Sequence, residues 1–203
     1  MQGSAWVPML TCSMHPDPIP TAIHVWPLPY EERLQQRAAG QIDMVVMHCT
    51  ELPDMALARE FGERIVHASD TGNSGHYYLD RDGSVQLFVR PNRIANHTRG
   101  YNERSIGVEL VNVGRYPDWL DSRRQQMTEP YPQAQVASLV ALLVMLRHEL
   151  PQLRLIAGHE DLDTGQVPAS DDPLLPVFRK RDPGPLFPWP QVLQESGLMR
   201  FAP

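Results

Sequence analysis

Two histidines and one aspartate stand where a folded chain could gather them around a metal ion. His48 directly follows the apolar run 42–47, and His159 closely follows a second apolar run at 153–157. Asp182 lies in a segment rich in turn-forming residues. Each histidine taken alone is more often structural, but two imidazoles and one carboxylate from three segments form the ligand set of an open zinc site. The sequence therefore predicts one Zn²⁺ ion per chain, held by these three side chains.

A single carboxylate interrupts another apolar segment. Glu109 lies within 105–111, which otherwise has the composition of a buried strand. Burying an unpaired carboxylate costs free energy, so this side chain must be exposed, paired or functional. A charged residue at a sheet edge is the ordinary explanation, and the pattern by itself leaves the alternatives open.

The elements that must position these residues alternate between strand and helix patterns. The predicted strands cover 42–48, 76–79, 84–89, 105–111 and 153–157, with a hairpin turn at 80–83, and the predicted helices cover 53–67 and the segment between Tyr131 and Pro151. This order predicts an α/β fold: a single domain with a central mixed β-sheet flanked by helices. Because such folds collect ligands where strands end, His48 and His159 are expected at one edge of the sheet.

Proline is concentrated toward both ends of the chain. Six of the 20 prolines fall in residues 1–40 and eight fall between 151 and 190. Because proline fixes φ and removes a backbone donor, we expect an irregular N-terminal arm with at most a short helix at 31–39, and a loop region near the C-terminus. The predicted division is an arm at 1–40, a domain at 41–192 and a tail at 193–203.

Composition excludes several classes of partner. The net charge is −6 and no dense stripe of lysine and arginine is present, so no nucleic-acid partner is expected. No apolar run is long enough for membrane insertion. Cys12 and Cys49 are too few for a disulfide framework and are expected as reduced thiols. Without a signal-peptide pattern, a cytoplasmic location is predicted, with release or export to the cell wall as the alternative; the oligomeric state stays open.

Five segments, in order, resemble the second family of zinc-dependent N-acetylmuramoyl-L-alanine amidases, which includes AmpD-like amidases, T7-lysozyme-type phage amidases and peptidoglycan recognition proteins. The segments are 45–50, 74–83, 97–110, 158–161 and 180–189. Together they span about residues 42–190. The resemblance implies the amidase fold and hydrolysis of the amide between the lactyl group of N-acetylmuramic acid and L-alanine, in peptidoglycan or muropeptide fragments.

The resemblance also implies a role for each matching residue. His48, His159 and Asp182 would be the zinc ligands, with Asp182 typical of the AmpD-like branch. Zinc would lower the pKa of water, Glu109 would accept the proton and return it to the leaving amine, and Lys180 would stabilise the oxyanion. His97 falls where family members keep a histidine near the substrate. Asn102, a polar residue that could line the groove, is the second candidate for substrate binding.

One departure from the AmpD-like pattern concerns the third ligand. The 22 residues between His159 and Asp182 exceed the compact connection typical of that branch. Asp172, followed by proline, could imitate the ligand turn, but it lacks both the preceding lysine and the following glycine, so the sequence favours Asp182. The extra residues are expected to flank the cleft and to alter which substrate lengths enter.

Two other functions compete with the amidase. Some relatives with this fold bind peptidoglycan without hydrolysing it after losing a zinc ligand, whereas this chain keeps all three candidates. A zinc peptidase unrelated to cell walls would be expected to carry a His-Glu-x-x-His helix, and the sequence has none. The amidase is therefore the preferred function and a non-catalytic binding module is the alternative.

Overall fold

A mixed sheet forms the centre of the protein. The structure is a computed structural model that describes residues 22–203, so the first 21 residues of the predicted arm lie outside it. In the described part of the chain, seven strands pair in the order β1 (Ile23–Val25), β4 (Val85–Leu87), β3 (Tyr77–Leu79), β5 (Ser105–Leu110), β2 (Met44–Cys49), β6 (Leu155–Gly158) and β9 (Met199–Arg200). Among the strand pairs of this sheet, only β3 and β4 run antiparallel. The α/β prediction is confirmed.

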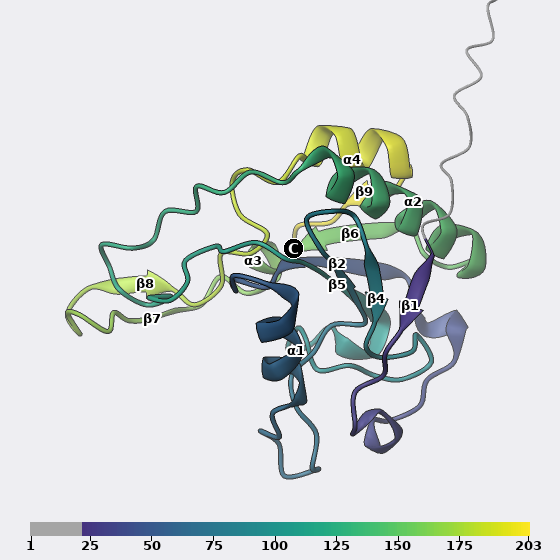
Figure 1. Cartoon of the computed structure of the whole chain (residues 1–203), viewed down its shortest axis with the longest axis horizontal. Coiled ribbons are helices and arrows are strands. Elements are labelled where there is room, and N and C mark those ends of the chain that lie inside the picture. Colours follow the sequence, from purple (N-terminus) through teal and green to yellow (C-terminus); the bar gives the residue numbers. More distant parts are fainter. Residues whose placement is uncertain (1–21) are drawn as a thin grey trace, which may run out of the picture.

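Helices cover both faces of the sheet (Figure 1). On one face, α2 (Gln133–Glu149) and α4 (Trp189–Ser196) pack their apolar side chains against Val45 and Val108. On the other face, α1 (Met55–Glu63) packs together with Tyr30 from the segment after β1. Apolar area buried on both sides explains why the central strands read as continuous hydrophobic runs.

The strand and hairpin predictions agree with the structure to within a few residues, but the first helix is shorter than predicted. Asp54 caps α1 through a 2.7 Å bond that its Oδ1 accepts from the Leu57 amide. The helix ends at Glu63 rather than at residue 67. The amides of Val66 and His67 donate instead to the Thr71 carbonyl, which closes a turn.

The predicted irregular ends contain more regular structure than their prolines suggest. β1 lies within the predicted arm, and β9 lies within the predicted tail, yet both strands belong to the main sheet. The short helix expected at 31–39 is wrong: only single 3₁₀ turns form, at Glu31–Arg33 and Ala39–Gln41, because residues 35–37 run extended beside 92–94. The domain boundaries themselves stay predictions.

The predicted C-terminal loop region carries a second, two-stranded sheet. β7 (Gln166–Pro168) and β8 (Pro176–Phe178) pair antiparallel with Pro168 opposite Pro176. They form a hairpin that projects from the body of the protein, at the left of Figure 1. A two-stranded ribbon consists of edge strands, where proline is tolerated. The hairpin is part of the connection between His159 and Asp182 that the sequence marks as long.

Two smaller expectations also concern the described residues. Cys49 is buried and is a free thiol in this part of the chain, whereas Cys12 lies outside it. Across residues 22–203, no helix combines the length and apolar character needed to cross a bilayer.

Candidate active site

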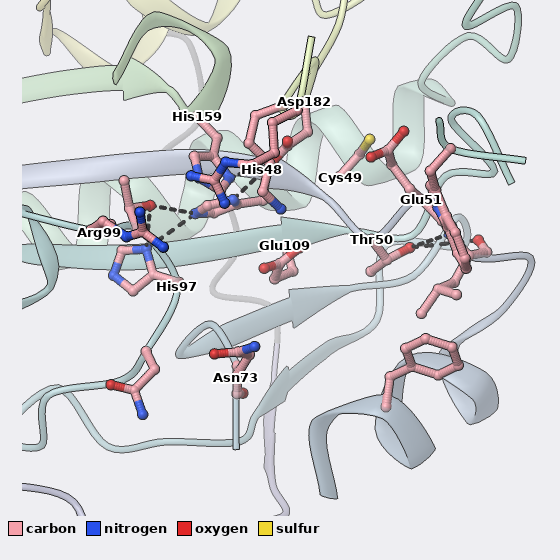
Figure 2. Close-up of a pocket in the computed structure, with 18 of the residues that line it drawn as sticks. His48, Cys49, Thr50, Glu51, Asn73, His97, Arg99, Glu109, His159 and Asp182 are labelled. Carbon is pink, nitrogen blue, oxygen red and sulfur yellow. Dashed lines mark hydrogen bonds and ion pairs between the residues drawn. The ribbon is translucent and has the colours of Figure 1, made fainter. Parts of the chain in front are cut away.

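A cleft of about 770 Å³ lies where the central strands end, and all seven predicted site residues line it. Figure 2 shows His48, His159 and Asp182 converging at one place in this cleft, with Glu109 and His97 beside them. The other two members are Asn102 and Lys180. The structure therefore brings together every residue that the sequence selects.

The register of the central strands sets the spacing of the site. His48 in β2 pairs directly with Glu109 in β5, and Glu109 pairs in turn with Tyr78 in β3. Residues directly opposite one another in a sheet project from the same face. His159 opens the short helix α3 (His159–Leu162) immediately after β6, the other neighbour of β2. Neighbouring strands thus deliver these side chains to one edge.

Three buried side chains form a candidate metal centre. Nδ1 of His48 lies 2.8 Å from Oδ2 of Asp182, and Nδ1 of His159 lies 3.0 Å from the same oxygen. One potential ligand atom from each residue lies within 4.8 Å of the other two. The exposed fractions are 2% for His48 and 3% for each of the other two, so the group is enclosed by protein.

The chemistry of this group fits a zinc ion. Two imidazole nitrogens and one carboxylate oxygen match the nitrogen and oxygen donors that zinc takes in open sites. Oδ1 of Asp182 is buried and has no hydrogen-bond partner among residues 22–203. A buried carboxylate oxygen without a partner is costly, and a bound cation would satisfy it.

Burial and the charges of the cluster also favour the protonation states in which these side chains bind a metal ion. Burial, followed by the neighbouring His159, lowers the pKa of His48 to about 4, so its imidazole is neutral near pH 7. Burial alone would raise the pKa of Asp182, but His159 and His48 outweigh it and hold that pKa well below its usual value. A neutral imidazole beside an ionised carboxylate is the form in which these groups bind metal.

The structure separates Asp182 from its sequence alternative. Asp172 lies in the turn of the β7–β8 hairpin, where its Oδ1 accepts a 3.0 Å bond from the Leu174 amide. It does not line the cleft. The long connection leaves the cleft after His159 and returns to it before Asp182. Asp182, rather than Asp172, therefore lies beside the two histidines.

Glu109 lines the cleft and is partly exposed. Burial, and then the charge of Asp182, raises the pKa of its carboxyl to about 8, while Lys180 opposes this shift. The sequence leaves open whether Glu109 is exposed, paired or functional. Among the described residues, no hydrogen bond or ion pair engages its side chain, so it is not paired. Gly75 packs against Glu109: a Cβ on Gly75 would lie 2.8 Å from the Glu109 Cγ.

His97 contacts the metal cluster from the neighbouring loop. Its Nδ1 lies 3.1 Å from Nε2 of His48 and 3.0 Å from the Thr98 hydroxyl. Asn102 supports this loop, because its Oδ1 accepts bonds from the His97 and Thr98 amides at 3.1 and 2.7 Å. The amide oxygen of Asn102 therefore holds His97 in place.

Two charged residues that line the cleft are not predicted from the sequence. Glu51 and Arg115 line it and form a buried ion pair at 2.7 Å. They lie in loops 64 residues apart, where no periodic pattern links them. The one available signal is the position of Glu51 three residues after His48.

Comparison with known proteins finds similarity to an N-acetylmuramoyl-L-alanine amidase and to a phage endolysin. The chain is 28% identical over 181 residues to the N-acetylmuramoyl-L-alanine amidase AmiD of Escherichia coli K12. This match covers 81% of this chain and 56% of AmiD. It is 28% identical over 130 residues to the endolysin of Escherichia phage T7, covering 63% of this chain and 82% of the endolysin. This chain thus spans little more than half the length of AmiD.

Solved structures share the fold. The complex of E. coli AmiD with anhydro-N-acetylmuramic acid-L-Ala-D-gamma-Glu-L-Lys is similar to this structure, with a TM-score of 0.59 and 24% identity over 81% of this chain and 60% of that one. The family described as N-acetylmuramoyl-L-alanine amidase, Amidase_2, matches residues 38–185. Because this match covers most of the chain and contains the whole cleft, the chain belongs to that amidase family.

Proposed function

We propose that this protein hydrolyses the amide bond between the lactyl group of N-acetylmuramic acid and the L-alanine of the peptidoglycan stem peptide. The observation that carries the proposal is the convergence of His48, His159 and Asp182 with Glu109 and Lys180 in one cleft of an Amidase_2 chain. The first three supply metal ligands, and the other two supply a proton carrier and a cation.

We propose one zinc ion per chain, held by the His48, His159 and Asp182 side chains. The enclosed nitrogen and oxygen donors and the unpartnered Asp182 oxygen support this assignment. When bound, zinc supplies Lewis-acid chemistry that acidifies water and polarises a carbonyl group.

Glu109 is the proposed general base and acid. A carboxyl whose pKa is raised toward neutrality suits both roles: its ionised form accepts a proton from water and its protonated form gives the proton to the departing amine. Its position directly opposite His48 in the sheet supports this role.

Lys180 is the proposed electrostatic stabiliser. Lys180 lines the cleft, and its positive charge acts to lower the pKa of both Glu109 and Asp182, which supports a role close to the reacting groups. A cation there stabilises the negative charge that develops on the attacked carbonyl oxygen. His97 and Asn102 are proposed to contact substrate at the same end of the cleft.

The proposed substrate is a muropeptide or peptidoglycan strand. The AmiD complex contains anhydro-N-acetylmuramic acid linked to a short peptide beginning with L-alanine, and this supports the same chemical class here. The predicted cytoplasmic location stays a prediction, and substrate size bears on it. Digestion of intact sacculi would favour action on the cell wall, whereas restriction to soluble anhydro-muropeptides would favour intracellular recycling.

The purified protein is expected to release free stem peptide from a soluble muropeptide, as measured by chromatography and mass spectrometry. Removal of metal with a chelator should abolish release, and added zinc should restore it, because the ligand set holds the ion that activates water. Binding of muropeptide without release, by a zinc-loaded protein, would favour the binding-module alternative. Cleavage at another bond would contradict the proposed reaction.

Replacing Gly75 by alanine is expected to lower kcat by about tenfold or more, because its Cβ would displace the Glu109 side chain and small misplacements of reacting groups are costly. The matched control is Gly40→Ala, since a Cβ there meets nothing within 4 Å in the described structure. Steady-state kinetics and zinc content check both variants. Unchanged kcat in Gly75→Ala would contradict the tight packing of Glu109.

A further inference from the structure

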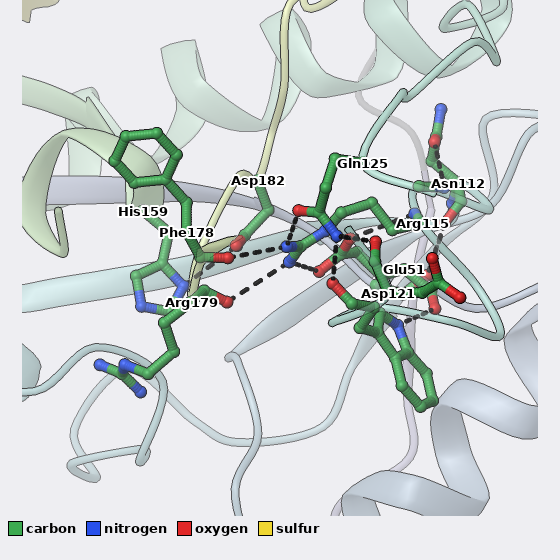
Figure 3. Close-up of polar contacts among 12 residues, drawn as sticks. Glu51, Asn112, Arg115, Asp121, Gln125, His159, Phe178, Arg179 and Asp182 are labelled. Atoms are coloured by element: carbon green, nitrogen blue, oxygen red, sulfur yellow. Dashed lines mark hydrogen bonds and ion pairs between the residues drawn. The ribbon is translucent and has the colours of Figure 1, made fainter. Parts of the chain in front are cut away.

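A buried ion pair fastens the loops that follow two central strands. Nε and Nη2 of Arg115 donate to the two carboxylate oxygens of Glu51 at 2.7 and 2.8 Å, and the Arg115 amide donates to the same carboxylate at 3.1 Å (Figure 3). Glu51 has a φ of 49°, in the left-handed region. These contacts fix a strained backbone three residues after His48, so the guanidinium has a defined position.

The same guanidinium reaches the segment that leads into Lys180. Its Nη1 donates to the Phe178 carbonyl at 2.9 Å and to Oε1 of Gln125 at 3.2 Å, and its Nη2 lies 3.4 Å from the Arg179 carbonyl. Figure 3 shows Arg115 lying between Glu51 and the Phe178–Arg179 backbone. The fork of an arginine can serve a carboxylate and several carbonyls at once, which a lysine ammonium cannot.

Asp182 is held by different contacts. Its carbonyl accepts a 2.9 Å bond from the Glu160 amide, and the next carbonyl, that of Pro183, accepts a 2.6 Å bond from the Tyr131 hydroxyl. Lys180 therefore lies between two sets of contacts. On its N-terminal side, Arg115 binds the Phe178 and Arg179 carbonyls, while Arg179 itself donates from its amide to the Gly165 carbonyl at 2.9 Å and pairs with Asp163. The bonds of Asp182 and Pro183 lie on its C-terminal side. Loss of the Arg115 bonds leaves the C-terminal bonds in place.

The need for the Arg115 bonds follows from the length of the connection. The chain leaves the cleft after His159, runs through the β7–β8 hairpin and reaches Asp182 after 22 intervening residues. In the described structure this hairpin is a two-stranded ribbon outside the main sheet, which is weakly stable by itself. Polar contacts such as that of Ser122 with Asp171 hold its far end. Arg115 holds its returning strand next to the cleft.

We propose that Arg115 is a positioning residue for Lys180: by binding the carbonyls of Phe178 and Arg179, it fixes the backbone from which the lysine reaches the reacting carbonyl. This inference rests on the proposed amidase function, in which Lys180 stabilises the oxyanion. It assigns Arg115 no contact with substrate.

Arg115→Lys is expected to lower kcat by about 10- to 100-fold with KM nearly unchanged, because a displaced Lys180 stabilises the transition state less well. Zinc content should stay at that of the unmodified protein, since Asp182 keeps its own anchor. The matched control is Arg59→Lys. Arg59 is also buried and donates to two backbone carbonyls, those of Trp26 and Pro27, but it does not line the cleft, so its kcat should not change.

A double-mutant cycle distinguishes positioning from general damage. If Arg115 acts through Lys180, Arg115→Lys has no further effect on kcat in a Lys180→Ala background. Equal losses in both backgrounds would overturn the proposal. If Arg115→Lys does not fold, Glu51→Gln replaces it in the cycle, because this variant loosens the guanidinium without removing it. Glu51→Gln is expected to lower kcat by a smaller factor, with no further loss in the Lys180→Ala background. Additive losses would again overturn the proposal.

Hydrogen exchange tests the anchor without relying on activity. Arg115→Lys should speed amide exchange in a peptide covering 176–181 by about tenfold or more, and should leave 155–162 unchanged. Arg59→Lys should change neither peptide. Unchanged exchange at 176–181 would overturn the anchor even in an active enzyme, whereas absence of stem-peptide release by the unmodified protein would instead overturn the proposed function.

Discussion

Replacing Asp182 by alanine is expected to remove zinc and hydrolysis together. The carboxylate contacts both histidines of the cluster and supplies the only oxygen donor of the candidate metal centre within the described residues. Loss of this donor leaves two imidazoles, too few for the three-ligand site that catalytic zinc occupies. Because a catalytic zinc ion would contribute several kcal/mol of transition-state stabilisation, kcat/KM should fall by about a thousandfold or more. Metal analysis and stem-peptide release measure the two losses.

The matched control is Asp172→Ala. Asp172 is the other aspartate that precedes a proline in the connection, but it lies in the hairpin turn and does not line the cleft. This variant should keep both zinc and activity. Full zinc occupancy in Asp182→Ala, or loss of zinc in Asp172→Ala, would contradict the ligand assignment.

Replacing Glu109 by glutamine is expected to lower kcat by about 100- to 10,000-fold while zinc content stays unchanged. Glutamine keeps the size of the side chain but can neither accept nor return a proton, and general acid–base catalysis contributes on that scale. Glu109 is not a member of the metal cluster, so the ion should remain bound. Steady-state kinetics on muropeptide, together with metal analysis of the same sample, separate this loss from that of Asp182→Ala.

Glu149→Gln at the end of α2 provides the control for Glu109→Gln, because Glu149 is exposed and does not line the cleft. Its kinetics should match those of the unmodified protein. Activity retained within a few-fold in Glu109→Gln would exclude Glu109 as the proton carrier. Loss of zinc in that variant would instead indicate that the carboxylate takes part in binding the metal.

The central strands were predictable because burial on both faces leaves an unbroken apolar run in the sequence. The ends were not, because their elements depend on tertiary pairing. β1 is short and largely exposed, and it forms by pairing with β4. The missed helix α4 carries Pro190 in its first turn, where the absent amide costs no hydrogen bond. Proline count alone therefore overstated the irregular structure.

The candidate site was predictable where residue type and chain position both carry information. His48 and His159 follow apolar runs, and Asp182 lies in a motif with Lys180. Arg115 carries no such signal, since its partner Glu51 is distant in sequence and the contact depends on how two loops fold back. The role of Arg115 is therefore visible only in the hydrogen bonds of the folded structure, because no sequence pattern marks it.

The strand order determines when, during folding, the residues of the candidate metal centre come together. β2 lies between β5 and β6, and these three strands come from widely separated parts of the chain. The ligands meet only after this long-range pairing, which is the slow part of folding. Zinc that binds the native state alone would therefore stabilise it by mass action and act mainly by slowing unfolding, with little effect on the folding rate. The metal would then set the lifetime of the folded domain as well as its chemistry.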